Sequence, residues 1–428
     1  MRLQREYEAP VHLNPNVRGL EPSATVAINE RSNVMRAEGR DVIKLGLGQS
    51  PFPVPATVVQ ALRDHAHVKD YLPARGLPAL REAVAAYHRR TLGIEAEADG
   101  VLVGPGSKEL LFLLQLVFDG DLLVPSPSWV SYAPQAQILG RKVEWLATDA
   151  AHGWKIDPAL LDAACASAPG RPRLLVLNYP SNPTGATYGA AELEAIAEVA
   201  RRRRLVVVAD EIYAEVHHEG GHQSLARWYP EGTIVSGGLS KWCGAGGWRL
   251  GTFLVPASLA WLADAMEAVA SETFTSVSAP VQHAAVRAFE GNREIDGYLQ
   301  RSRRILRALG GWAAGRLRGA GIDVIDPAGG FYLFPDFGPR AELLRGRGIL
   351  GARALCERLL QETGVAALPG VDFGRPAQEL TMRIAYVDFD GAAALQGAMP
   401  GRQLDEAWLR LHCERVVEAI ERICAWVS

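Results

Sequence analysis

Short, continuous apolar runs in the middle of the chain constrain the fold more than any other feature. They lie at residues 101–103, 122–124, 174–177, 205–209 and 233–235, and longer helical patterns separate several of them, such as the one over 107–118. Strands that are buried on both faces have continuous runs of this kind instead of an alternation of polar and apolar residues. The pattern therefore predicts an α/β fold with a mostly parallel central sheet flanked by helices.

The length of the chain predicts two domains. Single cores stop growing at about 250–300 residues, and this chain has 428. Residues 56–294 contain the apolar runs and are expected to form the large domain. Residues 1–55, with an extended start and a helix near 24–38, and residues 295–428, with strand candidates at 331–334 and 382–387, are expected to form a smaller α+β domain together.

Charge and cysteine content exclude several classes of protein. Lys and Arg number 45 against 48 Asp and Glu, and such a balance argues against nucleic acid or an anionic membrane as the main partner. No apolar run approaches the ~18–20 residues of a membrane span, and the first ten residues lack the apolar core of a signal peptide. The five cysteines are odd in number and form no CxxC pair, so we expect neither disulfides nor a metal site. A cytoplasmic protein is the default expectation.

Two polar clusters suggest functions that we do not assign. Arg201–Arg204 follow a helical pattern, and cations are favourable at the C-terminal end of a helix, so we expect them to close that helix. His217, His218 and His222 have no cysteine or carboxylate at the spacing of a metal site. We expect these histidines to lie in a solvated loop.

The residues that directly follow the apolar runs carry the functional signal, because ligands bind at the carboxyl ends of the strands in open α/β sheets. Each such residue also has a purely structural explanation: a glycine turn, a core tryptophan, a helix cap at Asp210 or an exposed lysine. Together they present an anion-binding turn, an aromatic ring, an amide, a carboxylate and an amine at one edge. They are Ser107, Lys108, Trp129, Asn182, Asp210, Tyr213, Ser240, Lys241 and Arg249.

The segment 238–251 resembles the lysine signature of the class I and II aminotransferases, which are fold type I enzymes dependent on pyridoxal phosphate. The likeness extends from Gly238-Leu239-Ser240-Lys241 to Trp248-Arg249-Leu250-Gly251, and further landmarks follow in family order from Gly46 to Arg383. The segments 106–109, 129–132 and 329–335 are similar to the bacterial aspartate aminotransferase-like subgroup. The resemblance implies fold type I, with a large domain and a smaller one built from both termini.

The resemblance assigns roles around the cofactor, pyridoxal 5′-phosphate. Lys241 would form the Schiff base and, once substrate displaces it, move the α proton. Asp210 would hold the pyridine nitrogen protonated. Tyr213 and Asn182 would meet the cofactor's 3′-oxygen, and Trp129 would stack on the ring.

The resemblance also assigns the residues that bind the phosphate group of the cofactor, and it implies a homodimer. Ser107, Lys108 and Arg249 would bind the phosphate, and Tyr71 would reach it across the interface of a homodimer with shared active sites. Many relatives have a serine where this chain has Gly238. Ser236 or Ser240 could replace that missing donor, and the sequence does not decide between them.

For the substrate, the resemblance assigns Arg383 to the α-carboxylate, with the backbone of residues 46–48, including Gly48, lining the other side. Asn182 is also expected to contact the substrate. Lys108 could instead meet a distal carboxylate of the substrate. The implied activity is amino transfer between an L-amino acid, such as aspartate, glutamate or an aromatic amino acid, and a 2-oxo acid by a ping-pong mechanism.

Other hypotheses remain open. A lyase, cyclase or oxidase dependent on the same cofactor could use the same site. A non-catalytic regulator with this fold would need a DNA-binding domain, and neither 1–55 nor 390–428 is long or basic enough for one. The stretch 387–407, rich in small residues, could be a lid or a disordered excursion.

Overall fold

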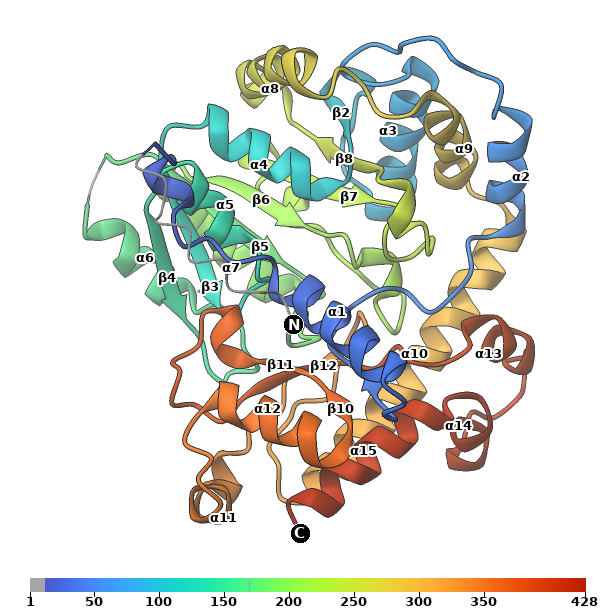
Figure 1. The fold of residues 1–428 in the computed structure, drawn as a ribbon. Helices are drawn as coiled ribbons and strands as arrows, with labels where there is room; N and C mark the ends of the chain where they lie inside the picture. The colour runs from blue at the N-terminus through green and yellow to red at the C-terminus, as the bar shows by residue number, and fades with distance from the viewer. Residues whose placement is uncertain (1–11, 169) are drawn as a thin grey trace.

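A seven-stranded sheet forms the centre of the protein in a computed structural model that describes residues 12–168 and 170–428 (Figure 1). The strand order is β2-β8-β7-β6-β5-β3-β4. β4, β3, β5, β6 and β7 pair in parallel, whereas β8 is antiparallel to both of its neighbours. The strands are β2 (Val101–Gly104), β3 (Asp121–Ser126), β4 (Val143–Ala147), β5 (Arg173–Asn178), β6 (Val206–Asp210), β7 (Thr233–Gly238) and β8 (Gly251–Leu254). The predicted mostly parallel sheet is confirmed, and β4 and β8 are strands that the apolar runs did not predict.

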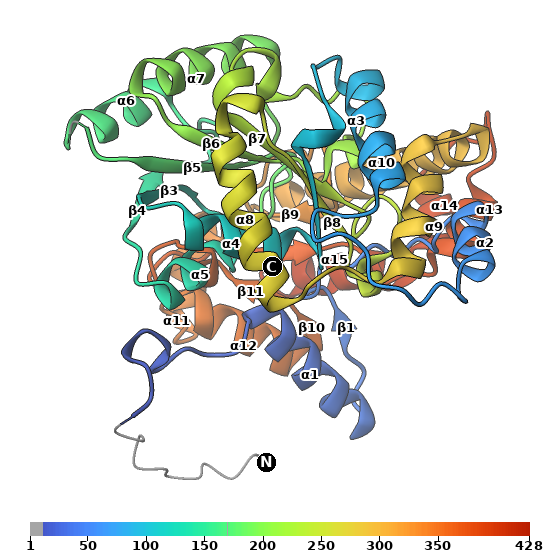
Figure 2. The same ribbon diagram turned by 90° about the horizontal axis from the view of Figure 1, so that it is seen from above.

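Helices cover both faces of this sheet. One face packs on α4 (Ser107–Val117), α5 (Tyr132–Ile138) and α8 (Ala260–Thr273). The other packs on α6 (Pro158–Ala166) and α7 (Ala190–Arg203), and Figure 2 shows these two helices on the opposite side of the strands from α4 and α5. Leu122 and Val124 of β3 point into the first core and Leu123 into the second. Burial of consecutive residues on opposite faces explains why the strands have continuous apolar runs.

The remaining helices of the central part pack at the β2 side of the sheet. They are α2 (Ala56–Asp64), α3 (Pro78–Leu92) and α9 (Ala279–Glu290). α3 and α9 contribute Leu80, Val84 and Phe289 to the same core as Val101 and Val103 of β2. This core continues into the C-terminal part of the chain.

A second, smaller set of strands comes from both ends of the chain. β9 (Tyr332–Leu333), β12 (Met382–Ala385) and β11 (Leu368–Pro369) form an antiparallel sheet, and β1 (Ile43–Lys44) pairs in parallel with β10 (Val365–Ala366). The β1–β10 pair joins residues 43–44 to residues 365–366, as a small domain built from both termini requires. The boundaries at 55 and 295 stay a prediction, and the extended start over residues 1–11 lies outside the described residues.

Helices surround these shorter strands (Figure 1). They are α1 (Ala24–Ala37), α10 (Arg293–Gly319), α11 (Ala341–Gly346), α12 (Ala352–Thr363), α13 (Gly391–Gly397), α14 (Glu406–His412) and α15 (Glu414–Trp426). The stretch 387–407 contains α13, whose residues Ala394 and Leu395 are buried in the core. That packing argues against a disordered excursion.

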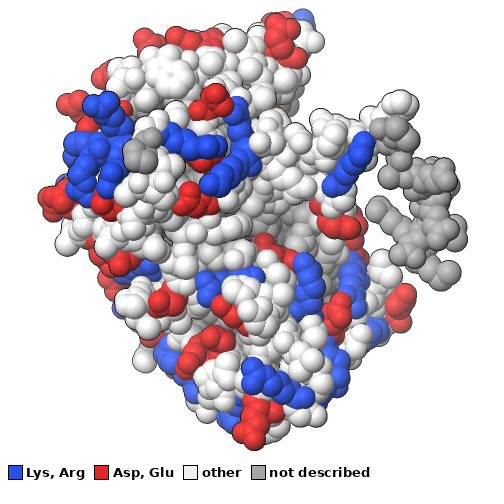
Figure 3. Space-filling view, turned by 90° about the vertical axis from the view of Figure 1, so that its left-hand side faces the viewer, with Lys and Arg blue, Asp and Glu red and all other residues white. Residues whose placement is uncertain are grey.

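The surface agrees with the balanced charge of the sequence. Basic and acidic side chains are intermingled over the face shown in Figure 3. Arg201 and Arg203 end α7, as expected, and pair with Glu231 and Asp162. Within the described part of the chain, no helix combines the length and the apolar character that crossing a membrane requires.

The expectation of a solvated histidine loop is wrong. His218 is 6% exposed, and the Nε2 atom of His222 lies 2.9 Å from a carboxylate oxygen of Glu211 in a pair that is almost fully buried. Tyr179 and Ser224 donate hydroxyl hydrogen bonds to the other oxygen of Glu211. Because Glu211 follows the buried end of β6, its charge needs partners there, and His222 is one of them.

Candidate active site

One cavity of about 340 Å³ gathers the side chains that follow the strands. Every predicted site residue except Tyr71 lines it, together with further polar residues that include Thr25, Asn178, Tyr132 and Tyr332. The predicted residues that line it are Gly48, Ser107, Lys108, Trp129, Asn182, Asp210, Tyr213, Ser240, Lys241, Arg249 and Arg383. A larger cavity of about 710 Å³ lies at the other end of β7, beside Thr233, and has none of these residues in its lining.

Lys241 lies in the turn after β7 and points into the cavity. Its Nζ atom donates a hydrogen bond of 2.7 Å to the backbone carbonyl of Gly48 and lies 5.4 Å from the centre of the Tyr213 ring. The turn depends on Gly238, which has a φ of +146° and a position where a Cβ atom would lie 2.7 Å from the carbonyl oxygen of Leu250. A side chain at this position would therefore require the backbone of the turn or of β8 to shift.

Asp210 is the last residue of β6 and is 3% exposed. Its carboxylate accepts hydrogen bonds from the hydroxyls of Tyr132, at 2.5 Å, and Ser236, at 3.2 Å. Burial raises the pKa of Asp210, whereas these two donors, the backbone N–H of Ile212 and the charge of Lys241 lower it.

These contacts bear on two questions that the sequence left open: whether Asp210 caps a helix, and whether Ser236 or Ser240 could donate to the phosphate. The reading of Asp210 as the cap of a helix is wrong, because a turn and a short 3-10 helix, Ala214–Val216, follow it and its carboxylate binds side chains instead. Ser236 is fully buried and engaged with Asp210, so it is not placed to replace the missing phosphate donor. Ser240 lines the cavity and remains the candidate.

Tyr213 and Arg383 lie on the side of the cavity that the C-terminal sheet forms. The hydroxyls of Tyr213 and Tyr332 are 2.7 Å apart. Arg383, which is 1% exposed, donates to the side-chain oxygen of Asn182 at 3.0 Å and to the backbone carbonyl of Gly46. Burial lowers the pKa of this guanidinium group. Asn182 therefore contacts Arg383, the residue predicted to bind the substrate carboxylate.

The guanidinium group of Arg383 lies against two aromatic rings. It lies 4.8 Å from the ring centre of Tyr332 and 5.0 Å from that of Phe373. Cation–π contacts of this kind stabilise a buried cation. Among the described residues the charge of Asp372 acts on Arg383, but no carboxylate forms an ion pair with it. A ligand carboxylate would supply the missing anion.

The start of α4 forms a cationic end of the cavity. Gly106 precedes the helix with a φ of +90°, and a Cβ atom there would collide with the guanidinium group of Arg249. Arg249 donates to the carbonyls of Gly246, at 2.9 Å, and Pro105, at 3.3 Å. Free N–H groups of the first helical turn, the hydroxyl of Ser107 and this guanidinium group are a donor set that fits a phosphate.

The Nζ atom of Lys108 lies 5.1 Å from the centre of the Trp129 ring. Burial, and then the charges of Arg249 and Lys241, lower the pKa of this lysine. The Trp129 ring in turn meets Tyr132 edge-on at 5.2 Å. An aromatic platform, a buried carboxylate and a phosphate-binding end thus surround one cavity, and this set fits pyridoxal phosphate.

Tyr71 is the exception among the predicted residues. It lies between α2 and α3, and its side chain is 90% exposed. Several lining residues of the cavity were not predicted from the sequence, and two of them, Tyr132 and Tyr332, contact predicted residues directly. Both stand inside quoted family segments, 129–132 and 329–335, but nothing in those segments indicates their partners.

Comparison with known proteins identifies the family. The family described as aminotransferase class I and II matches residues 40–390. The aspartate aminotransferase of Bacillus sp. (strain YM-2) is 32% identical over 86% of this chain and 93% of its own length. The aspartate/prephenate aminotransferase of Thermus thermophilus is 34% identical over 84% of this chain and 91% of its own.

Solved structures agree with the sequence matches. A structure of Thermus thermophilus aspartate aminotransferase with maleate superimposes with a TM-score of 0.82 and 31% identity over 96% of this chain and 99% of that one. The mostly parallel sheet and its helical layers are therefore those of fold type I. The chain belongs to the class I and II aminotransferases and is a transaminase that depends on pyridoxal phosphate.

Proposed function

We propose that this transaminase takes its amino group from an acidic L-amino acid and passes it to a 2-oxo dicarboxylic acid in a ping-pong cycle. The position of Lys108 carries the proposal. Its ammonium group lies over the Trp129 ring, and no carboxylate in the described part of the chain pairs with it. Arg249 donates to the carbonyl of Pro105 at the start of α4. A distal carboxylate of the substrate would pair with Lys108.

The names of the relatives support an acidic substrate. They include aspartate and aspartate/prephenate aminotransferases and, in Streptococcus mutans, an asparagine–oxo-acid transaminase that is 30% identical over 87% of this chain. The relatives named here are all transaminases, and none of them supports the lyase, cyclase or oxidase alternative. The regulator hypothesis likewise has no support among them.

The residues of the cavity would divide the work as follows. Bound pyridoxal phosphate supplies an electron sink for the α carbon of the substrate. Lys241 would attach the cofactor and later take and return the α proton at its Nζ atom. Asp210 would hold the proton on the pyridine nitrogen, and Tyr213 would donate to the 3′-oxygen. Arg383 would bind the α-carboxylate beside Gly48 and Asn182.

A substrate screen with a matched variant tests the acidic specificity. Holoenzyme is incubated with aspartate, glutamate, asparagine or phenylalanine and with 2-oxoglutarate, and the oxo-acid products are quantified. We expect aspartate and glutamate to be preferred. Lys108→Met should raise the KM for aspartate about 10–100-fold, the value of one charged hydrogen bond, and leave that for phenylalanine unchanged. An equal effect on both substrates would refute the role of Lys108.

We also propose a homodimer with shared active sites. Tyr71 is 90% exposed in the single chain, and it would be covered if it reached the phosphate site of a neighbouring subunit. Light scattering should give twice the mass of the 428-residue chain. Co-expression of Tyr71→Ala with Lys241→Ala should restore activity, because one site of the mixed dimer then has an intact lysine and the tyrosine of the other chain. No recovery would show that Tyr71 acts within its own chain or not at all.

Two further expectations belong to this proposal. The cysteines of the described chain are all unpaired and buried, which suits a reducing compartment such as the cytoplasm. The division into a large domain, 56–294, and a small one from 1–55 and 295–428 is supported by the β1–β10 pair. Limited proteolysis at the two boundaries tests it.

A further inference from the structure

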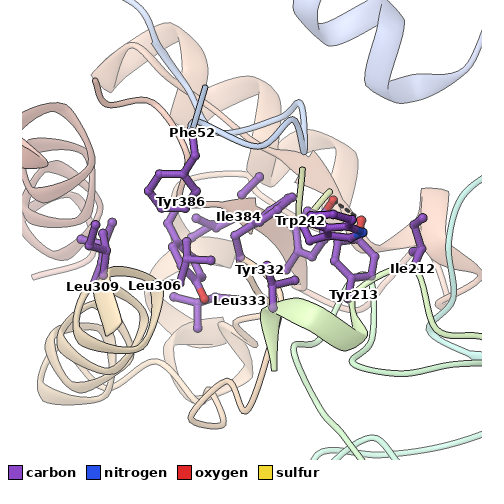
Figure 4. Packing of buried hydrophobic residues seen from close by; sticks show 14 of the residues in the cluster. Phe52, Ile212, Tyr213, Trp242, Leu306, Leu309, Tyr332, Leu333, Ile384 and Tyr386 are labelled. Carbon is purple, nitrogen blue, oxygen red and sulfur yellow. Dashed lines mark hydrogen bonds between the residues drawn. The ribbon is translucent and has the colours of Figure 1, made fainter. Parts of the chain in front are cut away.

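Tyr332 connects the two sheets across the active-site cavity. It lies on β9 of the C-terminal sheet, whereas Tyr213 follows β6 of the central sheet. Their hydroxyls are 2.7 Å apart, and both side chains are at most 2% exposed (Figure 4). A hydrogen bond in such a dry place is stronger than one at the surface, because no water competes for the two oxygens.

Among the described residues, the hydroxyl of Tyr332 has one other hydrogen-bond partner, the backbone carbonyl of Gly48. That distance is 3.5 Å, at the long limit for a hydrogen bond, and the carbonyl already accepts from Lys241 at 2.7 Å. A Cβ atom on Gly48 would collide with the hydroxyl, so the close approach is built into the chain. The contact with Tyr213 is therefore the strong hydrogen bond of this hydroxyl.

We propose that Tyr332 is a positioning residue whose hydroxyl donates to the oxygen of Tyr213 and so orients and polarises the Tyr213 proton toward the cofactor's 3′-oxygen. The inference rests on the proposed role of Tyr213. Each phenol has one proton. If Tyr213 donates its proton into the cavity, its oxygen can only accept from Tyr332, and consecutive hydrogen bonds strengthen one another.

The other charged and titratable groups around the pair come from several elements. Lys241 lies 5.4 Å from the Tyr213 ring, and the guanidinium group of Arg383 lies 4.8 Å from the Tyr332 ring. Asp210 and Tyr132 face Tyr213 from β6 and α5. Substitution Tyr332→Phe keeps the ring beneath Arg383 and removes the hydroxyl alone, so it leaves these groups in place.

A pH titration of the visible absorption band of the cofactor-loaded enzyme tests the inference. Hydrogen-bond donors stabilise the anionic 3′-oxygen, so a weaker donor raises the pH of the titration midpoint. We expect Tyr332→Phe to raise the midpoint by about 0.2–0.5 pH unit and Tyr213→Phe to raise it further. In the Tyr213→Phe background, Tyr332→Phe should add no shift, because its effect passes through the missing hydroxyl.

Tyr386→Phe is the matched control. Tyr386 is a fully buried tyrosine whose hydroxyl lies 3.4 Å from the carbonyl of Gly330 and does not line the cavity, so its loss should leave the midpoint unchanged. Suppose that Tyr213→Phe shifts the midpoint. The inference on Tyr332 is then overturned, and the proposed function is not, if Tyr332→Phe leaves the midpoint unchanged or shifts it equally in the wild type and in Tyr213→Phe. Wild-type protein without a visible band, or an unshifted Tyr213→Phe, overturns the proposed function of the site and the inference with it.

Discussion

The hydroxyl of Tyr132 donates a hydrogen bond of 2.5 Å to the carboxylate of Asp210, and both side chains are buried. Tyr132 begins α5 and Asp210 ends β6, so two separate elements meet at this contact. Burial raises the pKa of Asp210, and the Tyr132 hydroxyl is the first of the groups that lower it. The bond thus favours an ionised carboxylate where low solvation alone would favour a neutral one.

Replacing Tyr132 by phenylalanine removes this support. The pKa of Asp210 should rise, so the carboxylate accepts a proton at higher pH and the acidic limb of the kcat profile moves to higher pH. We expect kcat at neutral pH to fall about tenfold, the value of one such bond. Ser236→Ala should act in the same direction but less, because its bond is longer, at 3.2 Å. An acidic limb that stays in place would contradict this role of Tyr132.

The buried carboxylate of Asp210 should destabilise the cofactor-free protein at neutral pH. Its folded-state pKa is raised, so the group is most favourable to folding below its unfolded pKa of about 4 and becomes unfavourable as the pH rises through the folded value. Asp210→Asn should therefore raise the Tm of the cofactor-free protein at pH 7, and the difference should close toward pH 4. Differential scanning calorimetry from pH 4 to 8 measures both.

Asp149 provides the opposite case for the same measurement. Hydrogen bonds from His152 lower the pKa of this exposed carboxyl group. Asp149→Asn should therefore lower the Tm slightly at pH 7, with a difference that also closes at low pH. If Asp210→Asn lowered the Tm at neutral pH as Asp149→Asn does, the lost hydrogen bonds would outweigh the burial of the charge.

The apolar runs predicted five of the seven strands of the central sheet and missed β4 and β8, for different reasons. β4 is an edge strand, and its residues Val143, Glu144, Trp145 and Ala147 are partly or fully exposed, so it has no continuous apolar run. β8 follows the lysine signature directly, and its short segment 251–254 was interpreted as part of that motif. A pattern of apolar residues reports burial, and it identifies a strand only where burial is complete.

The candidate site shows the same limit. The proximity of the residues at the strand ends could be predicted from the sequence, because parallel strands bring their carboxyl ends to one edge of the sheet. Tyr132 and Tyr332 could not, because their partners, Asp210 and Tyr213, lie 78 and 119 positions away and meet them through tertiary packing. The burial of His222 was also missed, although its partner Glu211 lies only 11 positions away.

The buried pair of His222 and Glu211 should contribute to stability. His222→Leu leaves a carboxylate oxygen of Glu211 buried without a donor, which costs about 1–3 kcal/mol in the free energy of unfolding. His152→Leu is the control, since loss of its exposed pair with Asp149 should leave the free energy of unfolding nearly unchanged. Urea unfolding of the two variants measures the difference. Equal costs would show that His222 adds nothing beyond an exposed pair.

Gly238 stands where many relatives have a serine. Gly238 pairs with Gly251 of β8, and a Cβ atom at 238 would lie 2.7 Å from the carbonyl oxygen of Leu250. Gly238→Ser should therefore lower the free energy of unfolding by about 1–3 kcal/mol, because the two strands must separate or the backbone must leave its positive φ. Gly237→Ser is the matched control: the nearest atom there, the hydroxyl oxygen of Thr252, lies at 3.4 Å, an ordinary contact.

Measuring cofactor binding distinguishes two explanations for Gly238: a steric constraint on the turn, or the simple loss of a hydrogen-bond donor to the phosphate. If Gly238 is required by the strand pair, Gly238→Ser should bind pyridoxal phosphate no more tightly than the wild type, because the new hydroxyl arrives with a displaced turn and a displaced Lys241. Titration of the cofactor-free protein, followed by the visible band, gives the Kd. Tighter binding with unchanged stability would instead mean that the β7–β8 pair adapts easily and that the chain lacks a phosphate donor that it could accommodate.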